Sequence, residues 1–573
     1  MTAEASDLPI ARSITQRLSM RKFLLDLLAF ALVLIAPWFV LLGYHGYTLL
    51  APEVLLVAMA AVAIAVILAL ASGLMGALGR TVLFALLLTL FIDLHVTLPP
   101  SLSSILVVVL YLGVAAALGA LLWLLREHAS AIVSVIFVTL IAFTMLTTDP
   151  SFQRITNRAG TAAAHASNAP LLIHLVLDEH IGVEGLPPEI DAARRLRGEL
   201  LEFYTSRGFR LFGGAYSQYA NTENAIANLL NFAERGFNHS FVRRGTGGRE
   251  WELSDSAYFS MLQQRGYQLH LYQSTYIDLC HANGVRLRNC LTYPVASLES
   301  LQDLPLQARE KARFIVVALL SRSRSLLVLN RAYERLVRQP LARRGVDVPS
   351  RRLEPPSFGS LPVPAVLEQL TADIVAHPRG HAFFAHLMVP HYPYVFDDRC
   401  EMRPRAADWL TNHLTPSDSF VYNTAESRAQ RYELYTDQVR CVLSMLDDLL
   451  DTLESRGLLE GATVVVNGDH GSRIAAHFPN GINLRGGVLT DTDYRDTFST
   501  LYAIKAPGVQ PGYVQRPAPL VSLLDHYLGG EPLSEQSSCR VFLISGDARS
   551  VLTKVEPRFC AREENAASEG DHN

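Results

Sequence analysis

The chain has 573 residues, more than one small domain needs, and 50% of them are hydrophobic. Its formal net charge is −4 and 18% of its residues are charged. This charge balance gives no global field that would attract nucleic acid, so we expect no nucleic-acid partner. The mean hydropathy of +0.20 is high for a soluble protein, and the excess lies near the N-terminus.

Five apolar segments in the first 150 residues are long enough to cross a membrane. A helix needs about 20 apolar residues to span the hydrocarbon core. The segments are Lys22–Leu42, Val54–Met75, Thr81–Leu98, Ile105–Leu125 and Ala131–Leu146. We therefore predict that residues 1–150 form a domain of five transmembrane helices. A cleavable signal peptide does not explain the pattern, because several apolar spans follow the first one.

Basic residues predict the orientation of these spans. They occur before the first span, between the second and third, and after the fourth, as Arg12, Arg17, Arg21, Lys22, Arg80 and Arg126. The intervening loops 44–53 and 95–101 contain no Lys or Arg. The positive-inside bias then places the N-terminus in the cytoplasm. An odd number of spans delivers everything after about residue 150 to the opposite side.

All six cysteines lie in the part of the chain that is predicted to be exported. An even set in an oxidising compartment indicates disulfides. Because short loops are favoured, we expect sequential pairing as Cys280–Cys290, Cys400–Cys441 and Cys539–Cys560. Other pairings and buried free thiols remain alternatives.

The remaining chain alternates strand-like and helix-like patterns. Residues 151–170 are small and polar and read as a linker. Apolar β-rich runs at 171–182, 381–396 and 462–471 read as strands, and 431–458 has helical spacing. This alternation predicts an α/β/α layered sheet over 171–573. Several strands end in Asp, Glu or His, at the edge where ligands bind in such sheets.

Residues 305–352 differ from their surroundings because apolar patches alternate with many arginines. A helix with this mixture can lie on an anionic membrane face. It can equally be a domain-surface helix whose arginines extend toward water. The sequence leaves both interpretations open.

Three separated motifs carry residues suited to chemistry: "LVLDEH" with Asp178 and Glu179, "ANTENAIANLLN" with Thr222, and "NGDHG" with Asp469 and His470. Carboxylates, a hydroxyl and an imidazole suit one divalent ion such as Mn²⁺, Zn²⁺ or Mg²⁺. A hydroxyl beside such an ion becomes a nucleophile that can attack phosphorus. The bland alternatives are helix N-caps for Asp178 and Thr222 and a polar turn at 469–470.

The order of these motifs, with "HYPY" between the second and third, resembles the alkaline phosphatase/sulfatase superfamily. Five spans before such a domain resemble lipoteichoic acid synthases and related phosphoglycerol or phosphoethanolamine transferases. The resemblance implies Asp178 as first metal ligand, Glu179 as a possible second, and Asp469 and His470 as the others. It implies Thr222 as the nucleophile that also contacts the metal.

The resemblance also implies residues that bind substrate. His391 resembles a histidine that contacts phosphate, although it could merely orient the turn at Pro393. Arg473 and His477 follow the metal pair and could contact an anionic substrate. Ser217 is a second candidate nucleophile.

Two departures from the family patterns narrow the reaction. Phosphoethanolamine transferases usually continue as "DHGES", whereas this chain reads "DHGSRIAAHF". Sulfatases need Cys or Ser in a C/S-x-P/A-x-R frame, and none of the six cysteines stands in one. Sulfate ester hydrolysis is therefore disfavoured.

The resemblance implies a metal-dependent enzyme in the bacterial inner membrane, with its catalytic domain facing the periplasm or exterior. We expect it to move phosphoglycerol or phosphoethanolamine from a phospholipid to a cell-envelope glycan through a phospho-threonine. The alternatives are a phosphodiesterase or sulfatase-like hydrolase, and a non-catalytic protein of envelope assembly.

Overall fold

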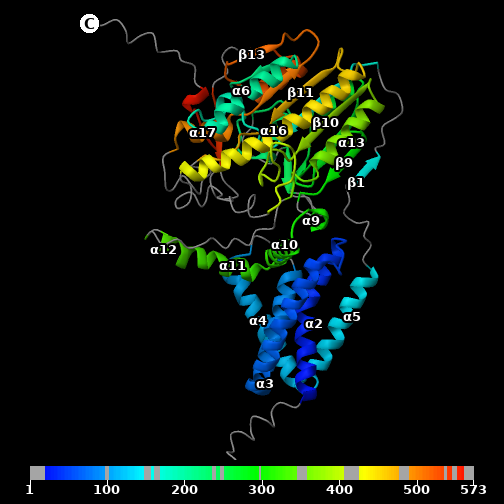
Figure 1. Cartoon of the computed structure of the whole chain (residues 1–573), viewed down its shortest axis with the longest axis vertical. Helices are drawn as coiled ribbons and strands as arrows, with labels where there is room; N and C mark the ends of the chain where they lie inside the picture. Colours follow the sequence, from blue (N-terminus) through cyan, green and yellow to red (C-terminus); the bar gives the residue numbers. More distant parts are fainter. Residues whose placement is uncertain are drawn as a thin grey trace, which may run out of the picture. The chain divides into compact units, whose positions relative to one another are not determined.

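The chain folds into two units (Figure 1). A helical unit comprises 1–153 and 296–357, and an α/β unit comprises 154–295 and 358–573. Residues 296–357 therefore interrupt the stretch 171–573 that the sequence assigned to one domain. The structure, a computed structural model, describes residues 20–96, 98, 102–147, 156–159, 168–234, 241–244, 251–295, 298–342, 344, 358–405, 425–475, 489–533, 539–544 and 552–560.

Four helices of the helical unit are long and apolar enough to cross a membrane. They are α2 (Met20–Tyr44), α3 (Pro52–His95), α4 (Ser104–Leu124) and α5 (Ala129–Thr147). The second and third predicted spans both lie in α3, which is interrupted at Gly76 with φ 71° and ψ −156°. The structure thus has four such helices among the described residues where the sequence predicted five.

The two halves of α3 pack against the same part of α2. Ser72 donates a hydrogen bond of 3.2 Å to Asp26, and Arg80 lies 3.6 Å from the same carboxylate. In a straight helix these two residues would be about 12 Å apart along the axis. Phe84 also stacks on Phe30 of α2 at 4.3 Å. The helix therefore reverses its direction at Gly76, and its halves coincide with two predicted spans. The five-span topology itself stays a prediction.

The segment after residue 296 adds short helices to the helical unit. These are α9 (Leu298–Asp303), α10 (Ala308–Leu320), α11 (Arg324–Tyr333), the π-helix η2 (Glu334–Arg338) and α12 (Gln339–Ala342).

A mixed nine-stranded sheet organises the α/β unit, in the order β1-β9-β7-β10-β2-β11-β12-β3-β13. Its central strands β7, β10, β2 and β11 run parallel, and β11 pairs antiparallel with β12. The strands are β1 (Thr156–Ala159), β2 (Leu172–Leu177), β3 (Arg210–Phe212), β7 (Gln268–Ser274), β9 (Leu287–Tyr293), β10 (His381–Leu387), β11 (Thr463–Gly468), β12 (Tyr502–Lys505) and β13 (Gly512–Val514). The first of them lies within the segment predicted to be a linker.

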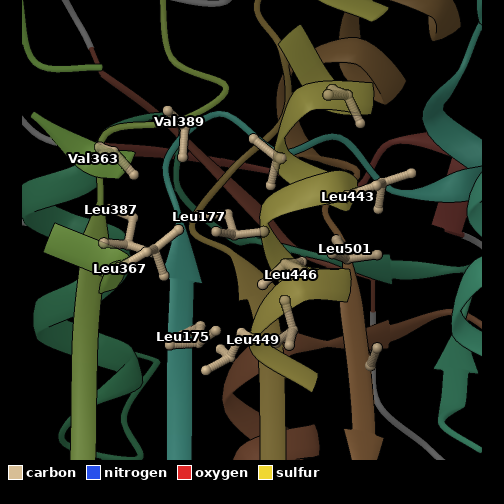
Figure 2. Close-up of a cluster of buried hydrophobic side chains, with 14 of the residues drawn as sticks. Leu175, Leu177, Val363, Leu367, Leu387, Val389, Leu443, Leu446, Leu449 and Leu501 are labelled. Carbon is tan, nitrogen blue, oxygen red and sulfur yellow. The ribbon is translucent and has the colours of Figure 1, made fainter. Parts of the chain in front are cut away.

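Helices cover both faces of this sheet. The larger core cluster joins the sheet to α6 (Asp191–Ser206), α13 (Val363–Ala376) and α16 (Ala425–Ser455). Figure 2 shows side chains of α13 and α16 meeting Leu175 and Leu177 of β2. The opposite face packs against α7 (Thr222–Leu229), α8 (Ala257–Gln264) and α18 (Leu520–Leu524). The described part of this unit therefore has the predicted α/β/α layers, because its central strands are apolar on both sides.

Smaller elements complete the described part of the α/β unit. The strands are β4 (Ala215–Tyr216), β5 (Val242–Arg244), β6 (Trp251–Leu253), β8 (Ile277–Asp278), β14 (Ala518–Pro519), β15 (Val541–Ile544) and β16 (Leu552–Val555). The helices are η1 (Val183–Gly185), α17 (Asp491–Phe498), η5 (Asp525–Gly529) and η6 (Arg558–Cys560).

The three predicted disulfides are confirmed. Cys280 pairs with Cys290, Cys400 with Cys441, and Cys539 with Cys560, at Cα–Cα distances of 6.2, 4.7 and 5.3 Å. The second bond joins α16 to the loop after β10 and so restrains that loop.

Candidate metal centre and nucleophile

Strand register brings the first and third sequence motifs together. Leu177 at the end of β2 lies opposite Gly468 at the end of β11, in parallel. The next residues along each strand are Asp178 and Asp469. Because the strands are parallel, both acids emerge at the same carboxyl edge of the sheet.

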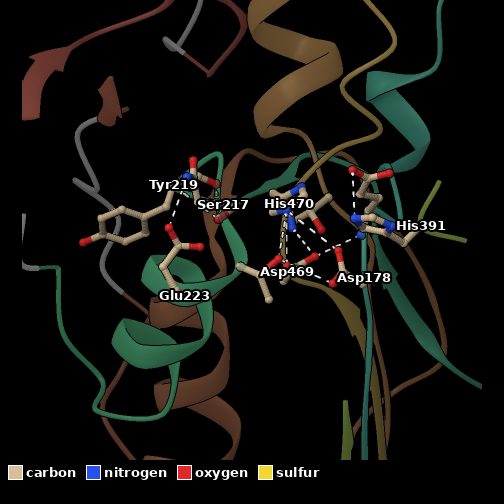
Figure 3. Close-up of polar contacts among 12 residues, drawn as sticks. Asp178, Ser217, Tyr219, Glu223, His391, Asp469 and His470 are labelled. Carbon is tan, nitrogen blue, oxygen red and sulfur yellow. Dashed lines mark hydrogen bonds and ion pairs between the residues drawn. The ribbon is translucent and has the colours of Figure 1, made fainter. Parts of the chain in front are cut away.

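Three fully buried residues at this edge can offer ligand atoms to one ion. Asp178, Asp469 and His470 each present one atom, and these atoms lie within 4.8 Å of one another (Figure 3). Asp178 Oδ1 and Asp469 Oδ2 are buried without a hydrogen-bond partner. Two orphaned carboxylate oxygens beside an imidazole are costly unless a cation binds them. This donor set fits a divalent metal ion.

Backbone and carbonyl contacts hold the ligand atoms of Asp469 and His470 in place. The N–H groups of Glu179 and His470 donate to Asp469 Oδ1 at 3.0 and 2.9 Å, which leaves Oδ2 facing the centre. His470 Nδ1 lies 3.0 Å from the carbonyl oxygen of Gly471. That acceptor favours the proton on Nδ1, so Nε2 carries its lone pair toward the cluster.

Thr222 joins the cluster from the other side. As the first residue of α7 it is buried, and its hydroxyl oxygen lies 3.4 Å from Asp178 Oδ2 and 3.3 Å from His470 Nε2. The N-terminus of a helix favours negative charge, including that of a phosphoryl group. The N-cap position of α7 is occupied by Asn221, which directly precedes the helix, so Thr222 is not the N-cap residue.

The pKa values of the two acids move in opposite directions. Burial acts to raise the pKa of Asp178, but the interactions with the neighbouring imidazoles of His391, His386 and His470 outweigh burial and lower it. For Asp469, burial and then the negative charge of Asp178 raise the pKa to about 6. The pair therefore resists carrying two negative charges in the absence of a cation.

His386 is a contact that the sequence reasoning missed. This fully buried residue of β10 places Nε2 3.3 Å from Asp178 Oδ2. The strand "HAFFAHL" offered a signal, because His386 is an isolated polar residue near the end of an apolar strand. Its register opposite Val176 puts it on the same face as Asp178, two residues further along β2.

The structure does not bring the Glu179 carboxylate into the cluster. Glu179 has φ 64°, and its side chain forms an ion pair with Arg473. It also accepts a 3.1 Å hydrogen bond from the Tyr392 N–H and lies 3.6 Å from His391 Nε2. A carboxylate that is neutralised by Arg473 is a poor metal ligand. The expected role of Glu179 as a second ligand is therefore corrected to that of an ion-pair partner.

Of the other candidate residues, two lie beside the cluster and one forms a local hydrogen bond instead. His391 and Arg473 lie together at Glu179, beside the cluster (Figure 3 shows His391). Ser217, the second candidate nucleophile, donates its hydroxyl to the Tyr219 carbonyl at 2.9 Å. His477 lies outside the described residues.

The glycines that flank the Asp–His pair are required by close packing. Neither Gly468 nor Gly471 has a left-handed backbone. A Cβ on Gly468 would overlap the His180 carbonyl oxygen, and one on Gly471 would overlap the backbone of Asp496. The loop that carries His470 therefore packs directly against the backbone of His180 and Asp496.

Neither a protein-family model nor a curated protein matches the sequence. The chain is similar to the solved phosphonate monoester hydrolase SpPMH of Silicibacter pomeroyi, with 17% identity over 65% of this chain and 79% of that one, at a TM-score of 0.36. It is similar to the C-terminal periplasmic domain of EcEptC from Escherichia coli, with 12% identity and a TM-score of 0.35. The match covers 70% of this chain and 96% of that domain. It is also similar to an alkaline phosphatase superfamily protein of Vibrio parahaemolyticus, with 10% identity and a TM-score of 0.35. This match covers 72% of this chain and 82% of that one. These likenesses are distant, and none of them by itself assigns an activity to this chain.

Proposed function

We propose that this protein is a metal-dependent, membrane-anchored phosphotransferase. It moves a phosphoryl-alcohol group, phosphoglycerol or phosphoethanolamine, from a phospholipid to a cell-envelope glycan. The transferred group is carried as a phosphodiester on Thr222. The observation that carries this proposal is the placement of the Thr222 hydroxyl, 3.4 Å from Asp178 and 3.3 Å from His470, against a cluster with two orphaned carboxylate oxygens.

Asp178, Asp469 and His470 would hold the divalent ion, and Thr222 would complete its ligands. When bound, such an ion lowers the pKa of an adjacent hydroxyl and offsets charge on phosphoryl oxygens. The orphaned oxygens support this assignment, since the described protein offers them no hydrogen bond. His386 of β10 lies 3.3 Å from the Asp178 carboxylate and would position it once the ion is bound.

The reaction has two balanced steps. The Thr222 oxygen attacks phosphorus of the phospholipid, the bond from phosphorus to the diacylglycerol oxygen breaks, and that oxygen receives the proton of the threonine hydroxyl. A glycan hydroxyl then attacks the phospho-threonine, displaces the threonine oxygen and returns a proton to it. The first turn of α7 favours negative charge on the phosphoryl group in both steps.

His391 and Arg473 would bind the anionic substrate beside this centre. Both already face the Glu179 carboxylate, so a guanidinium and an imidazole lie next to the cluster. A guanidinium matches two phosphate oxygens well.

The apolar helices α2–α5 support a membrane anchor, which keeps the enzyme near a lipid donor. The predicted orientation and the three disulfides support a periplasmic or exterior location for the α/β unit. The bacterial inner membrane is the compartment that fits both features.

The test is release of diacylglycerol from a fluorescent phospholipid by the purified full chain, with and without a glycan acceptor. We expect release to depend on added divalent metal and to be much faster with the acceptor. Thr222→Ala should lower the rate by at least about a thousandfold, because the nucleophile is lost. Ser217→Ala removes a nearby hydroxyl that is not in the cluster and should keep most of the rate.

Equal rates with and without acceptor would instead assign the site to a phosphodiesterase. A stable Thr222→Ala protein with unchanged turnover, or a wild-type chain with no turnover, would contradict the proposal.

A further inference from the structure

Three exposed hydrophobic side chains stand apart from the rest of the molecule. Among the described residues after 147, the large hydrophobic side chains that remain exposed are Leu329 at 63%, Leu336 at 76% and Val337 at 42%. All three lie on α11 and η2, within nine residues of one another. The described part of the α/β unit leaves no large hydrophobic side chain exposed. An apolar cluster of this kind marks an interaction surface.

The start of α11 is fixed to the end of α3. The buried Asp93 carboxylate accepts hydrogen bonds from the N–H groups of Arg324 at 3.0 Å and Ser325 at 3.1 Å. It also accepts from the Ser323 hydroxyl. Asp93 thus caps α11 from another helix, and it does so where the third predicted span ends.

This attachment places α11 beside the last turn of α3, where the third predicted span is expected to leave the hydrocarbon. Figure 1 shows α11 at the end of the helical bundle, next to the end of α4, with α12 extending past the side of the bundle. A helix held there cannot move away from the bilayer surface without breaking the contacts of Asp93. The exposed apolar residues of α11 and η2 therefore lie next to the predicted membrane boundary.

The segment has two chemically different sides. Leu329 and Leu336 are seven residues apart and share one side of the helix. Arg331 and Arg335 are exposed and lie on the other side. Residues 324–338 contain four arginines and one acid, Glu334, which pairs with Arg338. Basic residues opposite an apolar side are typical of helices that lie in a membrane interface.

We infer that α11 and η2 form an interfacial helix that lies in the outer surface of the same membrane that α2–α5 span. Leu329, Leu336 and Val337 enter the boundary with the acyl chains, where their burial is favourable. Arg331 and Arg335 remain at the depth of the phospholipid phosphates. For residues 324–338 we thus favour the membrane-surface interpretation of the two that the sequence left open, and this choice does not rest on the proposed transferase activity.

The test places a fluorescent label on single introduced cysteines in the full chain. The six native cysteines are disulfide-bonded, so the new thiol can be labelled selectively. The variants are L329C and L336C, with R331C as the matched control on the other side of the same helix. Each carries an environment-sensitive nitrobenzoxadiazole group in nanodiscs of phosphatidylcholine and phosphatidylglycerol.

We expect blue-shifted emission at 329 and 336, and at least about twofold stronger quenching by spin-labelled acyl chains than at 331. A Glu460→Cys label in the exposed turn before β11 should show emission typical of water and no quenching. Water-like emission at 329 and 336 would overturn the inference. Blue-shifted emission without lipid quenching would also overturn it, because a protein partner or a second copy would then cover this side.

Discussion

Asp178 and Glu179 are neighbours in the chain, yet their carboxylates contact two different sets of residues. Asp178 faces Asp469, His470 and Thr222 in a buried cluster. Glu179 turns away and meets Arg473 and His391. Among the described contacts, the two acids of the first set have no Lys or Arg partner. In the second set, the negative charge of Glu179 is compensated by the ion pair with Arg473.

This difference teaches how to tell a metal centre from a structural ion pair. A buried carboxylate that is paired with Arg has its charge compensated by the protein. Buried carboxylates with orphaned oxygens need a cation from outside, or they keep a proton. The predictions below separate the two groups, beginning with the largest effect.

Removal of one charged ligand should weaken metal binding more than any other single change. For Asp469→Asn we expect at least about a hundredfold weaker binding of Mn²⁺ or Zn²⁺ and a similar loss of turnover. Without metal, this variant should be at least as stable as wild type at pH 7. The reason is that the folded state raises the pKa of Asp469 to about 6, so ionising it disfavours folding.

Metal titration by calorimetry and thermal unfolding in chelator measure these two effects. Asp448→Asn, on the exposed side of α16, is the matched control and should change neither. Marked destabilisation of the metal-free Asp469→Asn protein would show that the carboxylate has a structural partner.

His386 should matter next, because it contacts Asp178 without belonging to the three-residue cluster. His386→Asn should weaken metal binding by about 10- to 100-fold, the range typical of residues that orient a ligand. His526→Asn, at η5, serves as a control outside the cluster. Unchanged metal affinity in His386→Asn would remove the orienting role.

The pH dependence of metal affinity follows from the raised pKa of Asp469. The metal competes with the proton on this carboxyl, so affinity should be flat above pH about 6 and fall about tenfold per unit below it. The check is metal affinity at a series of pH values in wild type and Asp469→Asn. The variant should lose this step. A step of equal size in both proteins would assign the proton to another group.

The smallest effect on the metal should come from the ion-paired acid. Glu179→Gln keeps the backbone N–H that donates to Asp469 but removes the charge that Arg473 faces. We expect metal affinity within about twofold of wild type and a loss of about 1–3 kcal/mol in the free energy of unfolding, since a partly buried pair is broken. Calorimetry and denaturant unfolding measure these quantities. A loss of metal affinity as large as that in Asp469→Asn would restore Glu179 as a ligand.

Much of the fold and of the site was predictable because local patterns carried it. Apolar runs ending in "DEH" and "GDHG" predicted the strands and the edge where Asp178 and Asp469 meet. The sequential disulfides followed from short loops. Register and side-chain direction were not predictable in the same way. The family resemblance implied Glu179 as a possible second ligand, but with its left-handed backbone its side chain meets Arg473.

Long-range packing accounts for what else was missed. His386 joins the site because β10 lies beside β2 in the sheet. Its position near the end of an apolar strand was a local signal, but that signal does not tell which strand lies next to it. Likewise, α3 reverses at Gly76 without a polar loop, so the structure has one interrupted helix where two spans were expected. Residues 296–357 join the helical unit through contacts such as that of Asp93 with Arg324, more than two hundred positions apart.

The central claim is tested most directly by the mass of the peptide that contains Thr222, after brief incubation of the full chain with phospholipid and divalent metal but without glycan. The account predicts that this peptide gains the mass of phosphoglycerol or phosphoethanolamine on Thr222, and that the added mass disappears when glycan is supplied. Product formation without any added mass on Thr222, or with the group on a different side chain, would contradict it.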